Sequence, residues 1–301
     1  MTIEEWRHSG KFFNYKGRNI FYQEAGSGET LLLIHGFPTA SWDWHHIWEP
    51  LTRRFHTLAP DMIGFGFSDK PRTYHYSLMD QADLLEVMME KMGIKSAHLL
   101  AHDYGGTVAQ ELLARWLERR GNHIEALDLK SITLLNGGIF PGLHRPRIIQ
   151  HLLASPAGPL LIPFIGRDQL AKTFREISGQ NTQPSAAEIN EYWSLIAYNA
   201  GKALLPRLMH YMHERRKFRV RWVGAIEMCP LPLCHINGTN DPISGRCIAK
   251  HFQQTAPQAQ VHFLEGTGHY PQVEAPAGVV RYFFQFLKMG SASGVGPGKI
   301  G

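Results

Sequence analysis

The sequence has few cysteines and no long apolar segment, and both absences limit what the protein can be. Its three cysteines, Cys229, Cys234 and Cys247, are an odd number without the spacing of a metal-ligand set, which suits a reduced compartment. No run of about 18 apolar residues occurs, so we expect no membrane span. The N-terminus lacks the apolar core of a secretion signal. We therefore expect a cytoplasmic protein.

The net charge of +5 says little about partners. Much of the excess lies in a basic cluster formed by Arg215, Arg216, Lys217, Arg219 and Arg221. Such a cluster can bind nucleic acid or anionic lipid, but no recognised nucleic-acid module accompanies it. We interpret the cluster as a solvated hinge and expect no nucleic-acid partner.

Strand-like and helix-like segments alternate through roughly the first 135 residues, which predicts a mostly parallel sheet with helices on both faces. The expected strands are Phe12–Tyr15, Asn19–Glu24, Leu31–Ile34, Phe55–Ala59, Ala97–Ala101, Ser131–Leu135, Leu231–Ile236 and Gln260–Leu264. Residues 137–227 have a helical pattern rich in Pro, Trp and Tyr. We predict an α/β core of residues 1–136 and 228–288, an inserted helical cap of residues 137–227, and a disordered tail of residues 289–301.

A sharp turn between a strand and a helix carries the main chemical signal. The expected strand Ala97–Ala101 leads through Asp103 into a helical pattern over Thr107–Trp116. This is a nucleophile elbow in which Asp103 stands where the pattern G-x-S-x-G has serine. The alternative is that Asp103 is only a helix N-cap.

An aspartate nucleophile changes the reaction that such an elbow can perform. A carboxylate with a pKa near ~4 is ionised at neutral pH and needs no base to attack. It can displace a leaving group from saturated carbon, whereas attack on an ester or amide carbonyl gives a mixed anhydride. Asp103 therefore favours epoxide opening or carbon–halogen cleavage and argues against esterase, lipase or peptidase activity. The resulting ester must then be hydrolysed by a histidine-activated water.

Two later loops supply the partners that this chemistry needs. Asp241 follows the strand-like run Leu231–Ile236, and His269 lies in a glycine-bounded loop after Gln260–Leu264. Nucleophile, acid and histidine in this order are typical of α/β-hydrolases, although each residue alone would be read as ordinary loop chemistry. The backbone N–H groups of Phe37 and Tyr104 are the predicted oxyanion hole.

These motifs resemble those of a known family. They are His35-Gly36-Phe37-Pro38, Asp61-Met62-Ile63-Gly64-Phe65-Gly66-Phe67-Ser68, His102-Asp103-Tyr104-Gly105-Gly106 and Gly268-His269-Tyr270-Pro271. From about Phe13 to Leu287 the chain resembles an α/β-hydrolase of the epoxide hydrolase and haloalkane dehalogenase branch. Within that branch it is similar to the mesoderm-specific transcript-like hydrolases, on segments such as Asn136-Gly137-Gly138-Ile139-Phe140-Pro141 and Arg221-Trp222-Val223-Gly224. The resemblance implies an α/β-hydrolase fold with a cap, and neither a metal nor an organic cofactor.

The resemblance also helps to sort the reactions. Haloalkane dehalogenases hold the halide with a Trp after the nucleophile and an Asn after His-Gly or a cap Trp. Here those first two positions are Tyr104 and Phe37, which leaves Trp193 as the candidate donor. Haloacetate dehalogenases place Arg after the nucleophile, whereas this chain has Tyr104 and Thr107, so we expect no small anionic substrate.

Epoxide opening instead needs an O–H or N–H donor for the ring oxygen. The family uses two cap tyrosines, or a histidine and a tyrosine. Tyr211 resembles the second tyrosine, and His151 lies near the position of the first donor. We predict hydrolysis of a small apolar epoxide to a vicinal diol, with the substrate against Phe37, Trp42 and Trp193.

Other interpretations stay open. They are a haloalkane dehalogenase with the same three residues, a non-catalytic binding protein and, remotely, a cofactor-free oxygenase. A homodimer is also left open.

Overall fold

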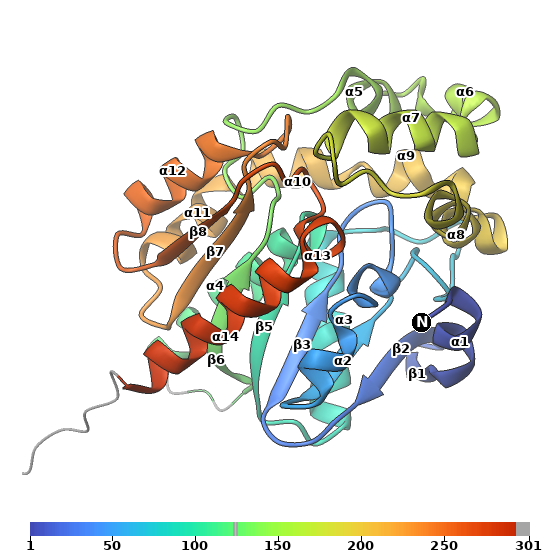
Figure 1. The fold of residues 1–301 in the computed structure, drawn as a ribbon. Helices are drawn as coiled ribbons and strands as arrows, with labels where there is room; N and C mark the ends of the chain where they lie inside the picture. Colours follow the sequence, from blue (N-terminus) through green and yellow to red (C-terminus); the bar gives the residue numbers. More distant parts are fainter. Residues whose placement is uncertain (123, 125, 293–301) are drawn as a thin grey trace, which may run out of the picture.

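The computed structural model describes residues 1–122, 124 and 126–292 (Figure 1). Its centre is an eight-stranded sheet in the order β1-β2-β4-β3-β5-β6-β7-β8. The strands are β1 Lys11–Tyr15, β2 Arg18–Ala25, β3 Thr30–Ile34, β4 His56–Pro60, β5 Ser96–Ala101, β6 Asp128–Leu134, β7 Leu233–Gly238 and β8 Gln260–Leu264. The β1–β2 and β2–β4 pairs are antiparallel and the other five are parallel. The predicted fold class is therefore confirmed, and every predicted strand is present with ends that differ by at most three residues.

Helices cover both faces of this sheet because alternate strand residues point to opposite sides. In β3, Leu32 and Ile34 join one apolar cluster, whereas Leu31 and Leu33 join the other. The first cluster includes residues of α3 Leu78–Lys91, α4 Tyr104–Gly121 and α11 Arg219–Glu227, and the second includes α1 Ile3–Ser9, α2 Trp48–Thr52 and α14 Pro276–Ala292. The remaining core helices are η1 Ser41–Trp44, α12 Arg246–Thr255 and α13 Pro271–Glu274.

The segment predicted as a cap is helical and lies over the carboxyl ends of the central strands (Figure 1). It contains α5 Ile148–Ala154, α6 Gly158–Leu161, η2 Ile162–Phe164, α7 Arg167–Ile177, α8 Ala186–Ala197, η3 Tyr198–Leu204, α9 Leu205–Leu208 and α10 Tyr211–Lys217. Its last helix, α11, packs along α4, where Glu111 accepts hydrogen bonds from Arg221 and Trp222. Because α11 packs on the core although it belongs to the predicted cap, the predicted end of the cap at residue 227 stays a prediction.

The predicted tail is partly wrong. The last helix, α14, continues to Ala292, so residues 289–292 are helical. Its apolar face packs on the sheet through Val279, Phe283 and Phe286, and the helix runs on beyond the last of these contacts. The remainder of that predicted tail, residues 293–301, lies outside the described residues. Within the part of the chain that the structure describes, no helix has both the length and the apolar character needed to cross a membrane.

Candidate active site

Asp103 occupies the tight turn between β5 and α4. Its backbone has φ 43° and ψ −104°, a conformation that is costly for a residue other than glycine. The turn fits because glycines approach it closely: a Cβ on Gly137 would lie 2.7 Å from the Asp103 Cα, and one on Gly105 would lie 2.2 Å from the Ile34 carbonyl oxygen. Asp103 stands at the N-cap position, but its side chain makes no capping hydrogen bond. The N-cap alternative therefore does not explain this carboxylate.

The Asp103 carboxylate is buried and binds two donors. Its Oδ2 accepts a hydrogen bond of 3.3 Å from the Phe37 backbone N–H, and its Oδ1 lies 3.3 Å from Nη2 of Arg215. Burial alone would raise the pKa of this carboxyl, but the charges of Arg215 and His269 outweigh it and lower the pKa below 3.8. Asp103 is thus a buried carboxylate that stays ionised at neutral pH.

His269 and Asp241 form a second buried pair. His269 Nδ1 lies 2.7 Å from Asp241 Oδ2, which also accepts hydrogen bonds from Ser244 Oγ and Asn136 Nδ2. Burial opposes the imidazolium form, but the charges of Asp241 and Asp103 and the hydrogen bond outweigh it and raise the pKa of His269 to about 9. The imidazole is therefore protonated while both carboxylates are charged.

The loop that carries His269 is hydrogen-bonded to both the cap and the core. The backbone N–H of His269 donates to the Ile177 carbonyl of α7, at 2.8 Å. The His269 carbonyl accepts a hydrogen bond of 2.8 Å from Nε2 of His102, because only the ring nitrogen can donate there. Burial, helped by the charge of His269, lowers the pKa of His102 to about 3, so this ring stays neutral.

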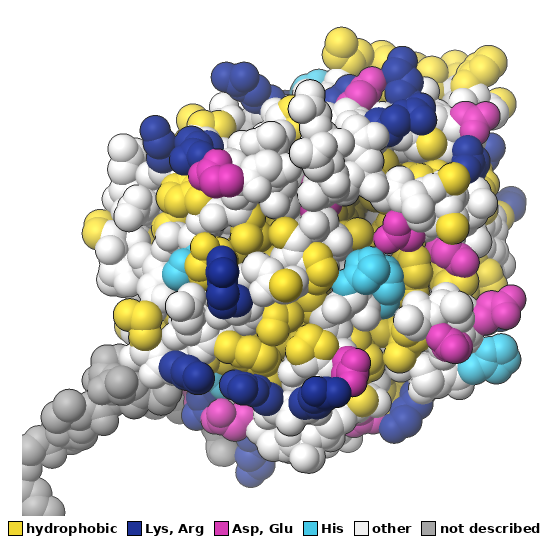
Figure 2. All heavy atoms as spheres, in the orientation of Figure 1, with side chains coloured by type: hydrophobic (Ala, Val, Ile, Leu, Met, Phe, Trp, Pro, Cys, Tyr) yellow, Lys and Arg dark blue, Asp and Glu magenta, His cyan; other side chains and the backbone are white. Residues whose placement is uncertain are grey.

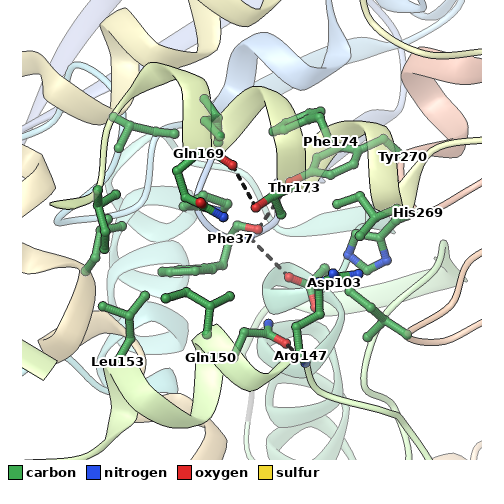
Figure 3. Close-up of a pocket in the computed structure, with 18 of the residues that line it drawn as sticks. Phe37, Asp103, Arg147, Gln150, Leu153, Gln169, Thr173, Phe174, His269 and Tyr270 are labelled. Carbon is green, nitrogen blue, oxygen red and sulfur yellow. Dashed lines mark hydrogen bonds between the residues drawn. The ribbon is translucent and has the colours of Figure 1, made fainter. Parts of the chain in front are cut away.

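Asp103 and His269 face one cavity between the core and the cap (Figure 3). The cavity has a volume of about 110 Å³. Its walls are mostly apolar, with Phe37, Pro38, Ile149, Leu153, Ile165, Leu170, Phe174, Ile177, Trp193, Ile196, Leu205, Ile243 and Tyr270, and its polar members away from Asp103 and His269 are Arg147, Gln150, Gln169 and Thr173. A mostly apolar cavity with a few convergent polar groups is the usual form of a small-molecule site.

The other predicted residues meet this site to different degrees. Trp193 and Phe37 line the cavity. Tyr211 is not among the residues that line the cavity; it is buried, with its ring 5.8 Å from that of Phe37, which does line it, and 5.1 Å from that of Tyr104. Burial and the charge of Asp103 raise the pKa of Tyr211 well above 10, so its hydroxyl stays protonated.

Two predicted positions are wrong. His151 is exposed on α5, whose cavity-lining residues are Ile149, Gln150 and Leu153, because successive residues of a helix point in different directions. Trp42 is buried but does not line the cavity: its ring stacks on His45 at 4.0 Å and packs against Tyr192. The sequence does not indicate where either side chain points.

Arg215 is a site residue that the sequence does not predict, because its basic cluster is typical of a solvated surface. The side chain is only 3% exposed. Its Nη2 donates to the Asp103 carbonyl at 2.9 Å, its Nε donates to Thr107 Oγ1 at 2.8 Å, and its guanidinium lies over the Tyr211 ring. The spacing of four residues between Tyr211 and Arg215 puts both on one face of α10, and this was the available signal.

Metal-binding geometry occurs at one place within the described residues, and it is away from the cavity. His45, His46 and Glu188 have ligand atoms within 4.8 Å of one another. The His46 Nε2 is 3.2 Å from Glu188 Oε1, and His46 is exposed. Since none of the three lines the cavity, the cluster has no direct part in chemistry at Asp103.

Comparison with known proteins agrees with this architecture. A model described as the alpha/beta hydrolase family matches residues 31–282. The chain belongs to the alpha/beta hydrolase family. This hydrolase is 41% identical over 299 residues to the mesoderm-specific transcript homolog protein of Bos taurus, which covers 95% of this chain and 88% of the relative. It is 35% identical over 276 residues to the hydrolase-named protein LipZ of Mycobacterium tuberculosis, with 91% and 94% covered.

Solved structures show the same fold at lower identity. The haloalkane dehalogenase DbeA of Bradyrhizobium elkani superposes with a TM-score of 0.78 at 24% identity, covering 95% of this chain and 99% of that one. The epoxide hydrolase CorEH superposes with a TM-score of 0.74 at 20% identity, covering 93% and 98%. The sequence identity to the mesoderm-specific transcript homolog proteins confirms the predicted resemblance to hydrolases of that type.

Proposed function

We propose that this hydrolase converts an apolar epoxide to a vicinal diol through a covalent ester on Asp103. The observation that carries the proposal is an ionised, buried carboxylate in the wall of an apolar cavity that it shares with a His269–Asp241 pair. An ionised carboxylate attacks saturated carbon without a base, and the apolar walls suit an uncharged substrate. A small apolar epoxide and water are thus the proposed partners.

In the first half-reaction, Oδ1 of Asp103 attacks a ring carbon and the carbon–oxygen bond of the ring breaks. Both carboxylate oxygens have a donor at 3.3 Å, the Phe37 N–H on Oδ2 and Arg215 Nη2 on Oδ1. We assign the attack to Oδ1 because Oδ2 then stays with the Phe37 N–H, where charge develops in the second half-reaction. The electron pair of the broken bond goes to the ring oxygen, which needs a proton. Tyr211, whose hydroxyl is protonated in the resting protein, gives this proton to the ring oxygen and regains one from protonated His269.

In the second half-reaction, water attacks Cγ of the ester and gives its proton to His269, which is now neutral. The charge that develops on Oδ2 is stabilised by the backbone N–H groups of Phe37 and Tyr104. The Cγ–Oδ1 bond then breaks, and the diol leaves with Oδ1 after taking a proton from His269. The carboxyl proton that remains on Asp103 returns to His269, so both groups regain their starting charges.

The charge state of His269 favours an epoxide over a haloalkane. With a pKa of about 9, the imidazole enters the cycle protonated and cannot act as a base. Epoxide opening consumes this proton at the ring oxygen, and hydrolysis of the ester returns it, so no proton exchanges with solvent. Halide displacement consumes none, so a haloalkane cycle needs one further step, the release of this proton to water after alkylation has removed the Asp103 charge that helps to raise the pKa of His269.

Haloalkane dehalogenation is the second candidate because Trp193 lines the cavity. Its indole N–H is a donor of the kind that holds a departing halide. A third candidate is a binding protein without turnover. The identity of the product separates all three, since an epoxide gives a diol, a haloalkane gives halide, and a binding protein gives neither.

The decisive experiment uses His269→Gln with styrene oxide and, separately, with 1-bromobutane. Gln cannot accept the proton of water, so the ester on Asp103 should accumulate and add the substrate's mass to the intact protein. Asp103→Asn is the matched control and should gain no mass with either compound. An adduct from styrene oxide but not from 1-bromobutane supports the epoxide reaction, and the reverse supports dehalogenation. If His269→Gln gains no mass with any epoxide or haloalkane, the covalent mechanism is wrong.

A further inference from the structure

One stretch of the cap contains no acidic or basic residue, unlike the rest of the chain. Residues 148–166 contain no Asp, Glu, Lys or Arg, whereas these residues make up 19% of the whole sequence. The stretch forms α5, α6 and η2, which lie at the outer edge of the cap, farthest from the sheet (Figure 1). A segment with this composition would ordinarily be buried.

Much of this stretch is nevertheless exposed. Ile148 is 79% exposed, Leu160 74% and Phe164 82%, and Leu152 is also exposed. We call these four residues the apolar cap edge. Figure 2 shows hydrophobic side chains gathered over α6, with Lys and Arg side chains beside them. Apolar side chains gathered in this way commonly mark a docking surface.

The charges around the apolar cap edge are mainly positive. Between residues 143 and 177 there are five basic residues, Arg145, Arg147, Arg167, Lys172 and Arg175, against two acidic ones, Asp168 and Glu176. The acidic side chains pair locally, Glu176 with Arg147 and Asp168 with Arg167. Exposed Arg145, Lys172 and Arg175 are therefore the net charge of this part of the cap.

We propose that the apolar cap edge docks on the surface of an anionic lipid bilayer. Apolar side chains that enter the interface, with basic residues at the level of the headgroups, are the features by which a protein without a membrane-spanning helix binds such a surface. A second copy of the chain fits less well. In a twofold dimer the same patch meets itself, which would bring the basic residues of both copies together.

The position of α5 links this surface to the cavity. Ile148 and Leu152 point to solvent, whereas their neighbours Ile149 and Leu153 line the cavity that contains Asp103. Ile165, directly after Phe164, also lines it. One short helix therefore separates the docking surface from the cavity, and an apolar substrate dissolved in the bilayer would have a short route to it.

The test is binding of the whole protein to vesicles, which needs no substrate and is independent of the proposed reaction. The probes are vesicles of phosphatidylcholine alone and of phosphatidylcholine with phosphatidylserine, separated by flotation. We expect the protein to float with the anionic vesicles, less with the neutral ones, and less at high salt because the attraction is screened. Absence of binding to the anionic vesicles would overturn the proposal.

A pair of double variants tests the location. Leu160→Ser with Phe164→Ser should weaken the partition by about tenfold or more, since two large side chains no longer enter the interface. Val220→Ser with Met228→Ser removes two side chains that are 83% and 67% exposed elsewhere, and should change nothing. Equal melting temperatures verify that both variants fold. Equal vesicle binding by the Leu160→Ser, Phe164→Ser protein and the unaltered protein would refute the assignment. So would a concentration-dependent dimer of the unaltered protein that is lost only in this double variant.

Discussion

At the scale of single residues, Arg215 explains how Asp103 can be both buried and charged. Burial of an isolated carboxylate is so unfavourable that it would take up a proton. Arg215 compensates with its positive charge, and it is itself held by Thr107 Oγ1 and the Asp103 carbonyl. Space for it exists because position 138 is glycine, where a Cβ would lie 2.6 Å from the guanidinium Nη1. Charge and shape therefore favour the same arrangement.

Replacement of Arg215 tests this pairing. Arg215→Gln leaves a buried carboxylate without its cation, so the free energy of unfolding should fall by about 3 kcal/mol. The pKa of Asp103 should rise. As the pH falls, the rate of its alkylation by an epoxide should therefore begin to decline at a higher pH than in the same background with Arg215 intact. Arg215→Lys keeps the charge and should restore part of both effects. The measurements are chemical denaturation and the pH dependence of adduct formation in the His269→Gln background.

Arg216 gives a matched control for this prediction. It neighbours Arg215 in the sequence but is exposed. Arg216→Gln should therefore leave both stability and alkylation nearly unchanged. Equal behaviour of the Arg215→Gln and Arg216→Gln proteins would show that the buried guanidinium does not sustain the charge of Asp103.

At the scale of elements, the start of α4 shows how a helix is fixed beside a strand. Gly105 and Gly106 are adjacent in the first turn of α4, but they differ in surroundings. A Cβ on Gly105 would lie 2.2 Å from the Ile34 carbonyl oxygen at the end of β3, whereas a Cβ on Gly106 would meet nothing within 4 Å. Only Gly105 is required for the close approach of the helix to the strand.

These two glycines make a paired stability experiment. Gly105→Ala should lower the free energy of unfolding by about 1–3 kcal/mol, because the backbone must shift to admit the methyl group. Gly106→Ala should raise it by up to about 1 kcal/mol, since alanine favours the helix and has room there. Urea denaturation of both variants measures the difference. Similar destabilisation in the two proteins would mean that the contact with β3 is not the cause.

At the scale of the whole molecule, the buried histidines make stability depend on pH. Burial lowers the pKa of His35 and His235 to about 4 and that of His102 to about 3, whereas the pKa of His269 is raised to about 9. The first three resist protonation and lower stability as the pH falls below 6.5. His269 acts in the opposite direction, because its folded pKa exceeds the ordinary value of 6.5.

The contribution of His269 can be isolated by difference. Its pairing should stabilise the fold fully below pH 6.5 and lose this effect as the pH rises through about 9, by on the order of 3 kcal/mol in all. In His269→Gln this dependence should be absent, while the effects of the other titrating groups remain. The measurement is the free energy of unfolding of both proteins between pH 6 and pH 9.5, stated as a difference. A difference that does not change with pH would contradict the raised pKa.

The sequence by itself determined the sheet, the elbow and the relation among its loops. Alternating apolar segments identify the strands because the period of side-chain burial is local, and parallel strands bring their carboxyl ends to one edge whatever the details of packing. Asp103, Asp241 and His269 could therefore be assigned to one region before any contact was known.

Only the tertiary structure decided which side chains of the cap meet Asp103. Arg215 looked like one of five solvated cations, and His151 looked like a proton donor, yet the structure buries the first and exposes the second. The physical reason is that short helices separated by Pro and Gly have no strong period of their own. Their orientation depends on packing against distant residues such as Thr107, which the local sequence does not encode.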